Sequence, residues 1–156
     1  MGVTGTSEFL HFGGVPPAIA SLVRIDYSKD TATAAGREPL SVGRHALAAT
    51  GHSSFGYFGG GTPGPKSTVD RIDYSNDTAT AVAKGPLSTV NYFMGATGNA
   101  DFGYFGGGSN PSTLSSVDRI DYSNDTADAV PKGSLPVAIT KVLATGNASF
   151  GYFGGG

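Results

Sequence analysis

The sequence reads VDRIDYSNDTA at Val69–Ala79 and repeats it without change at Val117–Ala127. A third copy, LVRIDYSKDTA, stands at Leu22–Ala32. A second repeated stretch, FGYFGGG, ends each unit at 55–61, 102–108 and 150–156, and a degenerate form, FLHFGG, stands at 9–14. Asp26, Asp73 and Asp121 occupy the same place in the repeat and lie 47 and 48 residues apart. The chain is therefore a tandem repeat with a period of about 47 residues.

The residue types inside the repeat favour strands over helices. The 156 residues include 25 Gly and 9 Pro, and each unit carries three consecutive glycines, which disfavour helices. Repeats of this length that are not helical are typical of four-stranded propeller blades. Within one unit we predict strands at His45–Thr50, Ser54–Phe58, Ser67–Tyr74 and Thr78–Ala83. Connections rich in Gly, Pro, Asn and Asp separate these strands. The predicted fold class is all-β, a β-propeller of four-stranded blades.

The unit resembles the kelch repeat, in which an apolar strand ends in a double glycine and a later strand ends near an acid. The double glycines are Gly59 and Gly60, Gly106 and Gly107, and Gly154 and Gly155. Asp26, Asp73 and Asp121 match the later acid, and the arginine that opens a kelch unit occurs once, as Arg44. The repeat also looks like repeats in tail- and surface-associated proteins of marine viruses and bacteria. That resemblance implies a virion or cell-surface setting.

The repeat count predicts assembly. We expect one repeat domain over residues 1–156, with units at about 15–61, 62–108 and 109–156, and residues 1–14 as a partial blade strand. Residues 7–14, 21–28 and 31–37 would supply strands two to four of a first blade, and residues 139–154 strands one and two of a last. Propellers close with about four to eight blades, so three blades per chain cannot close a ring. The expected partner is a second copy, giving a six-bladed head-to-tail homodimer. In that ring the strand at Phe9–Phe12 would duplicate the role of Phe150–Phe153 and would be surplus.

Composition argues against several partner classes. The formal net charge is −2 and 14% of the residues are charged, with no basic run, so we expect no nucleic-acid partner. No apolar stretch approaches the length of a membrane span, so no membrane partner is expected. The chain has no cysteine, which excludes disulfides, thiolate metal sites and cysteine nucleophiles.

One arginine and one aspartate recur on the third strand of each unit. The pairs are Arg24 with Asp26, Arg71 with Asp73, and Arg119 with Asp121. Residues two apart on a strand share a face, so we predict one structural ion pair per blade. The alternative is a ring of polar groups that lines a channel mouth and binds a small polar ligand.

A tyrosine also recurs on the second strand, as Tyr57, Tyr104 and Tyr152. Aromatic side chains on propeller strands commonly pack against the next blade, and this is the interpretation we favour. The alternative is that these rings stack on sugars, which would make the protein a carbohydrate-binding propeller with one site per blade.

Metal and catalytic motifs are weak. Asp73, Ser75 and Asp77 have the alternate spacing of a calcium loop, but the further acids, the central glycine and the distal glutamate of such a loop are missing, so a structural turn is favoured. No histidine belongs to a spaced ligand set, and no cofactor is expected. The only asymmetric polar set is Glu38, Arg44 and His45, which an enzyme formed across a subunit boundary would use. We expect a non-enzymatic structural or interaction scaffold that presents a symmetric binding surface to a protein or glycan.

Overall fold

The computed structural model describes residues 1–14, 17–64 and 66–156, and its strands form three four-stranded antiparallel sheets, one two-stranded sheet and a small ladder. The predicted unit boundary at residue 15 and the last proline of the loop at 62–65 lie outside the described residues. Sheet I consists of β1 (Gly2–Gly5), β2 (Phe9–Gly13), β3 (Leu22–Asp26) and β4 (Ala35–Arg37). Sheet II consists of β5 (Ala48–Gly51), β6 (Phe55–Gly59), β7 (Val69–Asp73) and β8 (Val82–Lys84).

The same order repeats further along the chain. Sheet III consists of β9 (Gly95–Gly98), β10 (Phe102–Gly106), β13 (Val117–Asp121) and β14 (Val130–Lys132). Sheet IV consists of β15 (Val142–Gly146) and β16 (Gly151–Gly155), and the small ladder pairs β11 (Ser109–Asn110) with β12 (Ser112–Thr113). A 3-10 turn follows each third strand: η1 (Tyr27–Lys29), η2 (Tyr74–Asn76) and η3 (Tyr122–Asn124). The all-β class and the four-stranded repeating sheet are confirmed.

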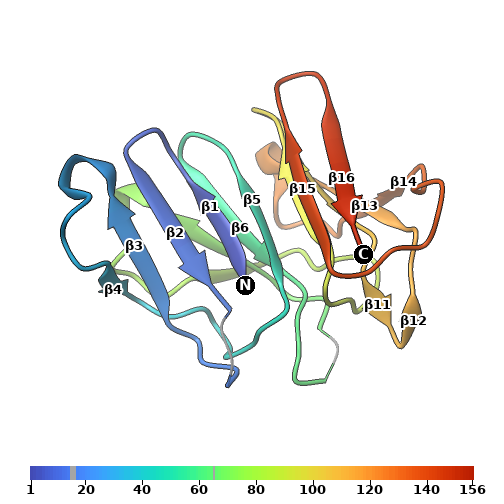
Figure 1. Cartoon of the computed structure of the whole chain (residues 1–156), viewed down its shortest axis with the longest axis horizontal. Coiled ribbons are helices and arrows are strands. Elements are labelled where there is room, and N and C mark those ends of the chain that lie inside the picture. The colour runs from blue at the N-terminus through green and yellow to red at the C-terminus, as the bar shows by residue number, and fades with distance from the viewer. Residues whose placement is uncertain (15–16, 65) are drawn as a thin grey trace.

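The first strands of the four sheets line up against one another. β1 packs against β5, β5 against β9, and β9 against β15. Sheet I lies at the left of Figure 1 and sheet IV at the right. One buried cluster, which includes Leu22, Phe58 and Ile72, joins sheets I and II. A second, which includes Tyr57 and Phe105, joins sheets II and III. The buried core therefore lies in two layers, one at each of the first two junctions between sheets.

The expectation that the chain starts in the middle of a blade is wrong. β1 pairs with β2 over Gly2–Gly5, so sheet I of the single chain has all four strands and the strand at Phe9–Phe12 is the second of them. Thr4-Gly5 repeats the Thr-Gly pair that ends the other first strands, at 50–51, 97–98 and 145–146, and this signal identifies β1. The prediction of two strands within residues 139–154 is confirmed, with β16 ending one residue later.

Two strand boundaries differ from the prediction by three residues or more, and the others by one or two. β5 begins at Ala48 rather than His45 because Ala46 has a φ of 56°, which interrupts the extended backbone. The fourth strand begins at Val82 rather than Thr78, since the amide of Ala79 bonds to the Asn76 carbonyl in the turn and that of Ala81 bonds to Pro39 of the preceding unit. Local alternation of residue types could not reveal either constraint.

Candidate functional site

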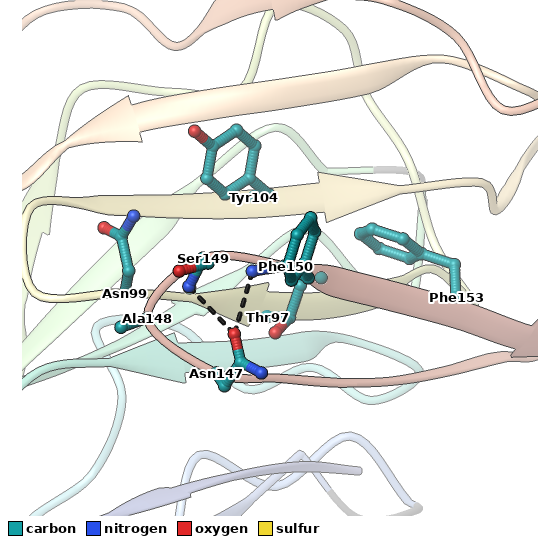
Figure 2. Close-up of a pocket in the computed structure, with 10 residues that line it drawn as sticks. Thr97, Asn99, Tyr104, Asn147, Ala148, Ser149, Phe150 and Phe153 are labelled. Atoms are coloured by element: carbon teal, nitrogen blue, oxygen red, sulfur yellow. Dashed lines mark hydrogen bonds between the residues drawn. The ribbon is translucent and has the colours of Figure 1, made fainter.

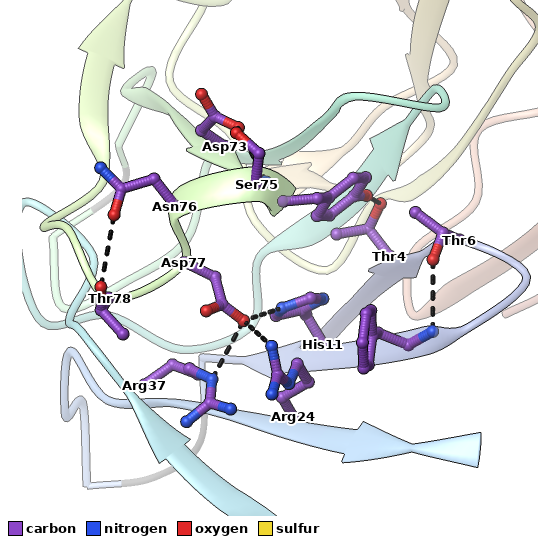
Figure 3. Close-up of polar contacts among 12 residues, drawn as sticks. Thr4, Thr6, His11, Arg24, Arg37, Asp73, Ser75, Asn76, Asp77 and Thr78 are labelled. Atoms are coloured by element: carbon purple, nitrogen blue, oxygen red, sulfur yellow. Dashed lines mark hydrogen bonds and ion pairs between the residues drawn. The ribbon is translucent and has the colours of Figure 1, made fainter. Parts of the chain in front are cut away.

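A carboxylate from sheet II holds three side chains of sheet I. Asp77 follows the η2 turn, and its Oδ2 lies 3.0 Å from His11 Nε2, 2.8 Å from an Arg24 guanidinium nitrogen and 3.0 Å from Arg37 Nε (Figure 3). His11 is fully buried on β2, Arg24 lies on β3 and Arg37 ends β4. One carboxylate thus bridges three strands of the neighbouring sheet.

The junction between sheets II and III repeats this arrangement. Asp125 follows η3 and accepts a 3.0 Å hydrogen bond from the Tyr57 hydroxyl and a 2.7 Å bond from Arg71. Lys84 Nζ lies 3.2 Å from its other oxygen. We call the strand-borne groups that hold the carboxylate the donor set: His11, Arg24 and Arg37 in sheet I, and Tyr57, Arg71 and Lys84 in sheet II. The contact is a repeated coupling between successive sheets.

Electrostatics stabilise both bridging carboxylates in their charged form. Burial by itself would raise the pKa of Asp77, but the His11 hydrogen bond and the Arg24 and Arg37 charges bring that pKa below its usual value. Burial likewise opposes ionisation of Asp125, and hydrogen bonds from Tyr57, Lys84 and Arg71 lower its pKa overall. These contacts hold the sheets together as charge-assisted hydrogen bonds.

The tyrosines of η2 and η3 seal the same two junctions. The Tyr74 hydroxyl lies 2.7 Å from Thr4 Oγ1, and that of Tyr122 lies 3.1 Å from Thr50 Oγ1. Burial raises the pKa of each of these two tyrosines to about 12. A Cβ added at Gly56 would come within 2.8 Å of the Tyr74 hydroxyl, so glycine makes room for the ring at this position. The turn therefore inserts a tyrosine and presents an aspartate to the preceding sheet.

The predicted partner of the repeated arginine is wrong. Arg24 and Arg71 pair with Asp77 and Asp125 of the next sheet, not with Asp26 and Asp73 two residues away on their own strands. Residues two apart share a face of the strand, but the aspartates that bond to these arginines lie 53 and 54 positions away in the sequence. Each arginine also lies over a phenylalanine of its own sheet, and Arg119 lies 4.1 Å from the Phe102 ring centre.

The strand-end aspartates serve the turns instead. Asp26, Asp73 and Asp121 each accept a 2.9 Å hydrogen bond from the amide of the serine two residues later, and a shorter one from its hydroxyl. The serine hydroxyl and amide lower the pKa of Asp73 below its usual value. Among the described residues no group of three or more potential metal ligands is present. The spacing that resembles a calcium loop forms a capped 3-10 turn.

The recurring tyrosines have three different environments. Tyr57 is fully buried, its hydroxyl bonds to Asp125, and its ring stacks on Tyr122 with centres 4.9 Å apart. Tyr104 is half-buried and Tyr152 is 59% exposed. At Tyr57 the ring is enclosed between sheets II and III and presents no free face to a sugar.

The double glycines allow close packing and sharp turns. Gly60, Gly107 and Gly155 have φ values of 70°, 68° and 96°, the left-handed region that favours glycine. An added Cβ at Gly59 would lie 2.6 Å from the Phe105 ring and one at Gly106 would lie 2.8 Å from the Phe153 ring, whereas Gly154 has open space around it. The first glycine of the pair therefore makes room for a phenylalanine of the next sheet in sheets II and III. Sheet IV has no next sheet among the described residues, and Gly154 faces open space.

Arg44 has a structural role that the sequence did not reveal. Its guanidinium donates to Asp70 at 2.9 Å and to the Phe58 carbonyl at 2.9 Å, and both charged side chains are 0% exposed. Asp70 also accepts hydrogen bonds from the Ser41 amide and hydroxyl at 3.0 and 2.6 Å. His45 forms a backbone bridge to Thr62. Arg44 is fixed in the core, so the set of Glu38, Arg44 and His45 does not present this guanidinium to a substrate.

The junction between sheets III and IV contains a cavity where the first two junctions contain a tyrosine. It measures about 250 Å³ and is lined by Thr97 and Tyr104 of sheet III and by residues 147–151 of sheet IV (Figure 2). In Figure 2 the Asn147 side chain accepts bonds from the Ser149 and Phe150 amides at 2.8 and 2.9 Å and so shapes the loop at one wall. Sheet IV contributes β15 and β16 only, and no third-strand turn of this chain reaches the cavity within the described residues.

No family model matches the sequence, and no curated protein matches it. No helix within the part of the chain that the structure describes is long and apolar enough to cross a membrane.

The His11 contact predicts acid sensitivity. Burial lowers the pKa of His11 below its ordinary value of 6.5, and the charges of Arg24 and Arg37 lower it further. Together they outweigh Asp77, which raises this pKa. The unfolded chain then binds the proton more readily, so the free energy of unfolding should fall as the pH drops below about 6.5. Burial also lowers the pKa of His52, which acts in the same direction.

Urea unfolding between pH 7.5 and 5 measures this effect. The repeat offers natural replacements: His11 stands where the other units have Tyr57, Tyr104 and Tyr152, and His52 stands where they have Asn99 and Asn147. The double variant His11→Tyr/His52→Asn should flatten the pH dependence over this range, because neither new side chain titrates there. An equally steep loss of stability in the variant would contradict the assignment.

Proposed function

We propose that the protein is a non-enzymatic structural scaffold, a kelch-like propeller arc that assembles with a second copy of itself and presents its loops as a repeated surface. The repeated coupling between sheets supports this function most directly. Tyr57 and its partners fill the second junction, and His11 and its partners fill the first. These side chains, which recur with the repeat, are engaged in joining sheets, as expected of a scaffold.

The last sheet leaves apolar surface that none of the described residues covers. Leu143 is 80% exposed, Phe150 65% and Tyr152 59%, whereas Phe58 and Tyr57, in the sheet II strand equivalent to that of Tyr152, are fully buried. Apolar patches of this kind mark interaction surfaces. β16 also pairs with β15 alone among the described residues, so its outer edge can accept another strand.

A head-to-tail dimer satisfies both features by strand exchange. In the proposed dimer, β3 and β4 of a second copy add to β16 of the first, and the second copy receives the equivalent pair. Each chain then provides sheets II and III and half of each of two shared sheets, which gives a ring of six blades. The β1–β2 hairpin leaves sheet I in this exchange, because β15 and β16 take its place.

Sequence differences favour the exchanged pairing. In sheets II and III a glycine stands opposite the third-strand isoleucine, as Gly56 does opposite Ile72, and it accommodates the tyrosine hydroxyl. In sheet I the equivalent residue is Leu10, opposite Ile25. β16 restores glycine at this place, as Gly151, beside Tyr152. The β15–β16 hairpin is thus closer to the common pattern than β1–β2.

Mass measurement tests the proposal. Sedimentation equilibrium and native mass spectrometry should find a species of two chains, each of 15.7 kDa. A chain that remains monomeric at micromolar and higher concentrations would overturn the assembly. The alternative of one sugar site per unit has no support at Tyr57, whose ring is enclosed between sheets II and III.

A further inference from the structure

We propose that Thr97, Tyr104, Arg119 and Lys132 form a socket that binds the Asp26–Asp30 turn of a second copy, with the Tyr27 ring in the cavity and the Asp30 carboxylate between the two cations. This inference rests on the proposed self-assembly and specifies the side chains that recognise the partner. The socket would be a peptide-binding site for a tyrosine followed three residues later by an aspartate.

The cationic part of the socket repeats a donor set that is occupied elsewhere in the chain. Tyr104 lies opposite Arg119 in sheet III, and Tyr57 lies opposite Arg71 at the equivalent place in sheet II. Lys132 lies opposite Val117, as Lys84 lies opposite Val69. In sheet II this set holds Asp125. No ion pair to Arg119 or Lys132 forms among the described residues, whereas Arg71 and Lys84 both hold Asp125.

The cavity is the aromatic part of the socket. At the second junction the Tyr122 ring stacks on Tyr57 and its hydroxyl reaches Thr50. The equivalents of these two partners at the third junction are Tyr104 and Thr97, and both line the cavity of about 250 Å³ (Figure 2). Asn147 and the loop that follows it form the opposite wall. A tyrosine that enters here from a turn would meet the same ring and the same hydroxyl.

The tyrosine and the aspartate that match the socket are exposed in the turn that follows β3 of sheet I. Tyr27 is 47% exposed, whereas Tyr74 and Tyr122, its equivalents, are partly buried. Asp30 is exposed and forms no ion pair within the described part of the chain, in contrast to Asp77 and Asp125.

The backbone already has the required shape. Asp26 caps η1 with φ and ψ of −98° and 114°, and Asp73 caps η2 with −97° and 116°. The turn at 26–30 therefore needs no remodelling to present its tyrosine and aspartate as the turn at 73–77 does. The other two copies of this turn are occupied within the chain, which leaves the turn at Asp26–Asp30 of a second copy as the occupant.

Sedimentation equilibrium of the full chain tests the socket with single and paired variants. Asp30→Asn and Arg119→Gln should each weaken dimerisation about tenfold or more, since each removes one member of a charge-assisted contact. Tyr27→Ala should weaken it similarly. A chain that carries both Asp30→Arg and Arg119→Asp should recover most of the lost affinity. Asp101→Asn, an exposed aspartate in the β9–β10 loop, is the matched control and should leave dimerisation unchanged.

The outcomes separate this inference from the proposed assembly. If Asp30→Asn and Arg119→Gln leave both the dimerisation affinity and the thermal melting of the chain unchanged, the socket is wrong. The proposed self-assembly would then still hold. If the full chain stays monomeric, the assembly fails, and a labelled peptide of residues 22–37 then tests recognition by fluorescence anisotropy. Peptide binding that Arg119→Gln weakens about tenfold would support the socket, and failure of the peptide to bind would overturn it.

Discussion

Replacing Arg44 with alanine is expected to lower the free energy of unfolding by about 3–5 kcal/mol, the usual cost of leaving a buried charge without its partner. Arg44 and Asp70 are both 0% exposed and lie 2.9 Å apart. The arginine also donates to the Phe58 carbonyl, so its loss removes that hydrogen bond and leaves an uncompensated carboxylate in the core. Urea denaturation, followed by circular dichroism, measures the change.

The neighbouring unit supplies the control for this prediction. Asp118 accepts the same two hydrogen bonds from Ser88, at 2.8 and 2.7 Å, that Asp70 accepts from Ser41. Asn91 stands in the place of Arg44, and it bonds to Gly107 and Ser109 instead of the aspartate. Asp118→Ala should therefore cost less than Asp70→Ala, because no buried cation loses its partner.

A double-mutant cycle completes the test. The variant Arg44→Ala/Asp70→Ala should be less destabilised than the sum of the two single variants, because removal of both charges leaves neither one unpaired. Additive single effects would show that the pair is not coupled and would contradict the structural assignment of Arg44.

Deleting Met1–Gly14 is expected to tighten dimerisation by about tenfold or more. In the proposed dimer the β15–β16 hairpin of one copy competes with the β1–β2 hairpin of the other for pairing with β3. The deletion removes the hairpin that β3 pairs with from Leu22 to Asp26. β3 then has an unpaired edge, and the face of sheet II that β1 covers is exposed. Both would be satisfied by β15 and β16 of a second copy. Sedimentation equilibrium compares the truncated chain with the full one.

The opposite truncation is the matched control. Removing residues 142–156 deletes the accepting hairpin and leaves sheets I to III complete, so this chain should be monomeric. A truncated chain without residues 1–14 that is folded and monomeric would refute strand exchange, and so would a dimer that survives removal of residues 142–156.

The amino-acid sequence by itself determined the period, the strand-rich unit and the chemistry of its turns. Identical copies at 69–79 and 117–127 must form the same local structure, and Gly, Asn and Asp act on backbone conformation within a few residues. β1 was also within reach, because Thr4-Gly5 carries the ending common to the first strands. The strand boundary near Ala46 could not be predicted from the sequence, since an alanine with a left-handed backbone has no sequence signature.

Only the tertiary structure decided which charges pair and which side chains are left exposed. Arg24 has Asp26 nearby on its strand, yet it bonds to Asp77, 53 residues away. Local spacing fixes which face of a strand a side chain occupies, whereas the partner on that face belongs to whichever sheet packs there. The same reason explains why Tyr57, Tyr104 and Tyr152 share one motif but differ in burial. The burial of each ring depends on whether a complete sheet follows, and the local motif does not encode this.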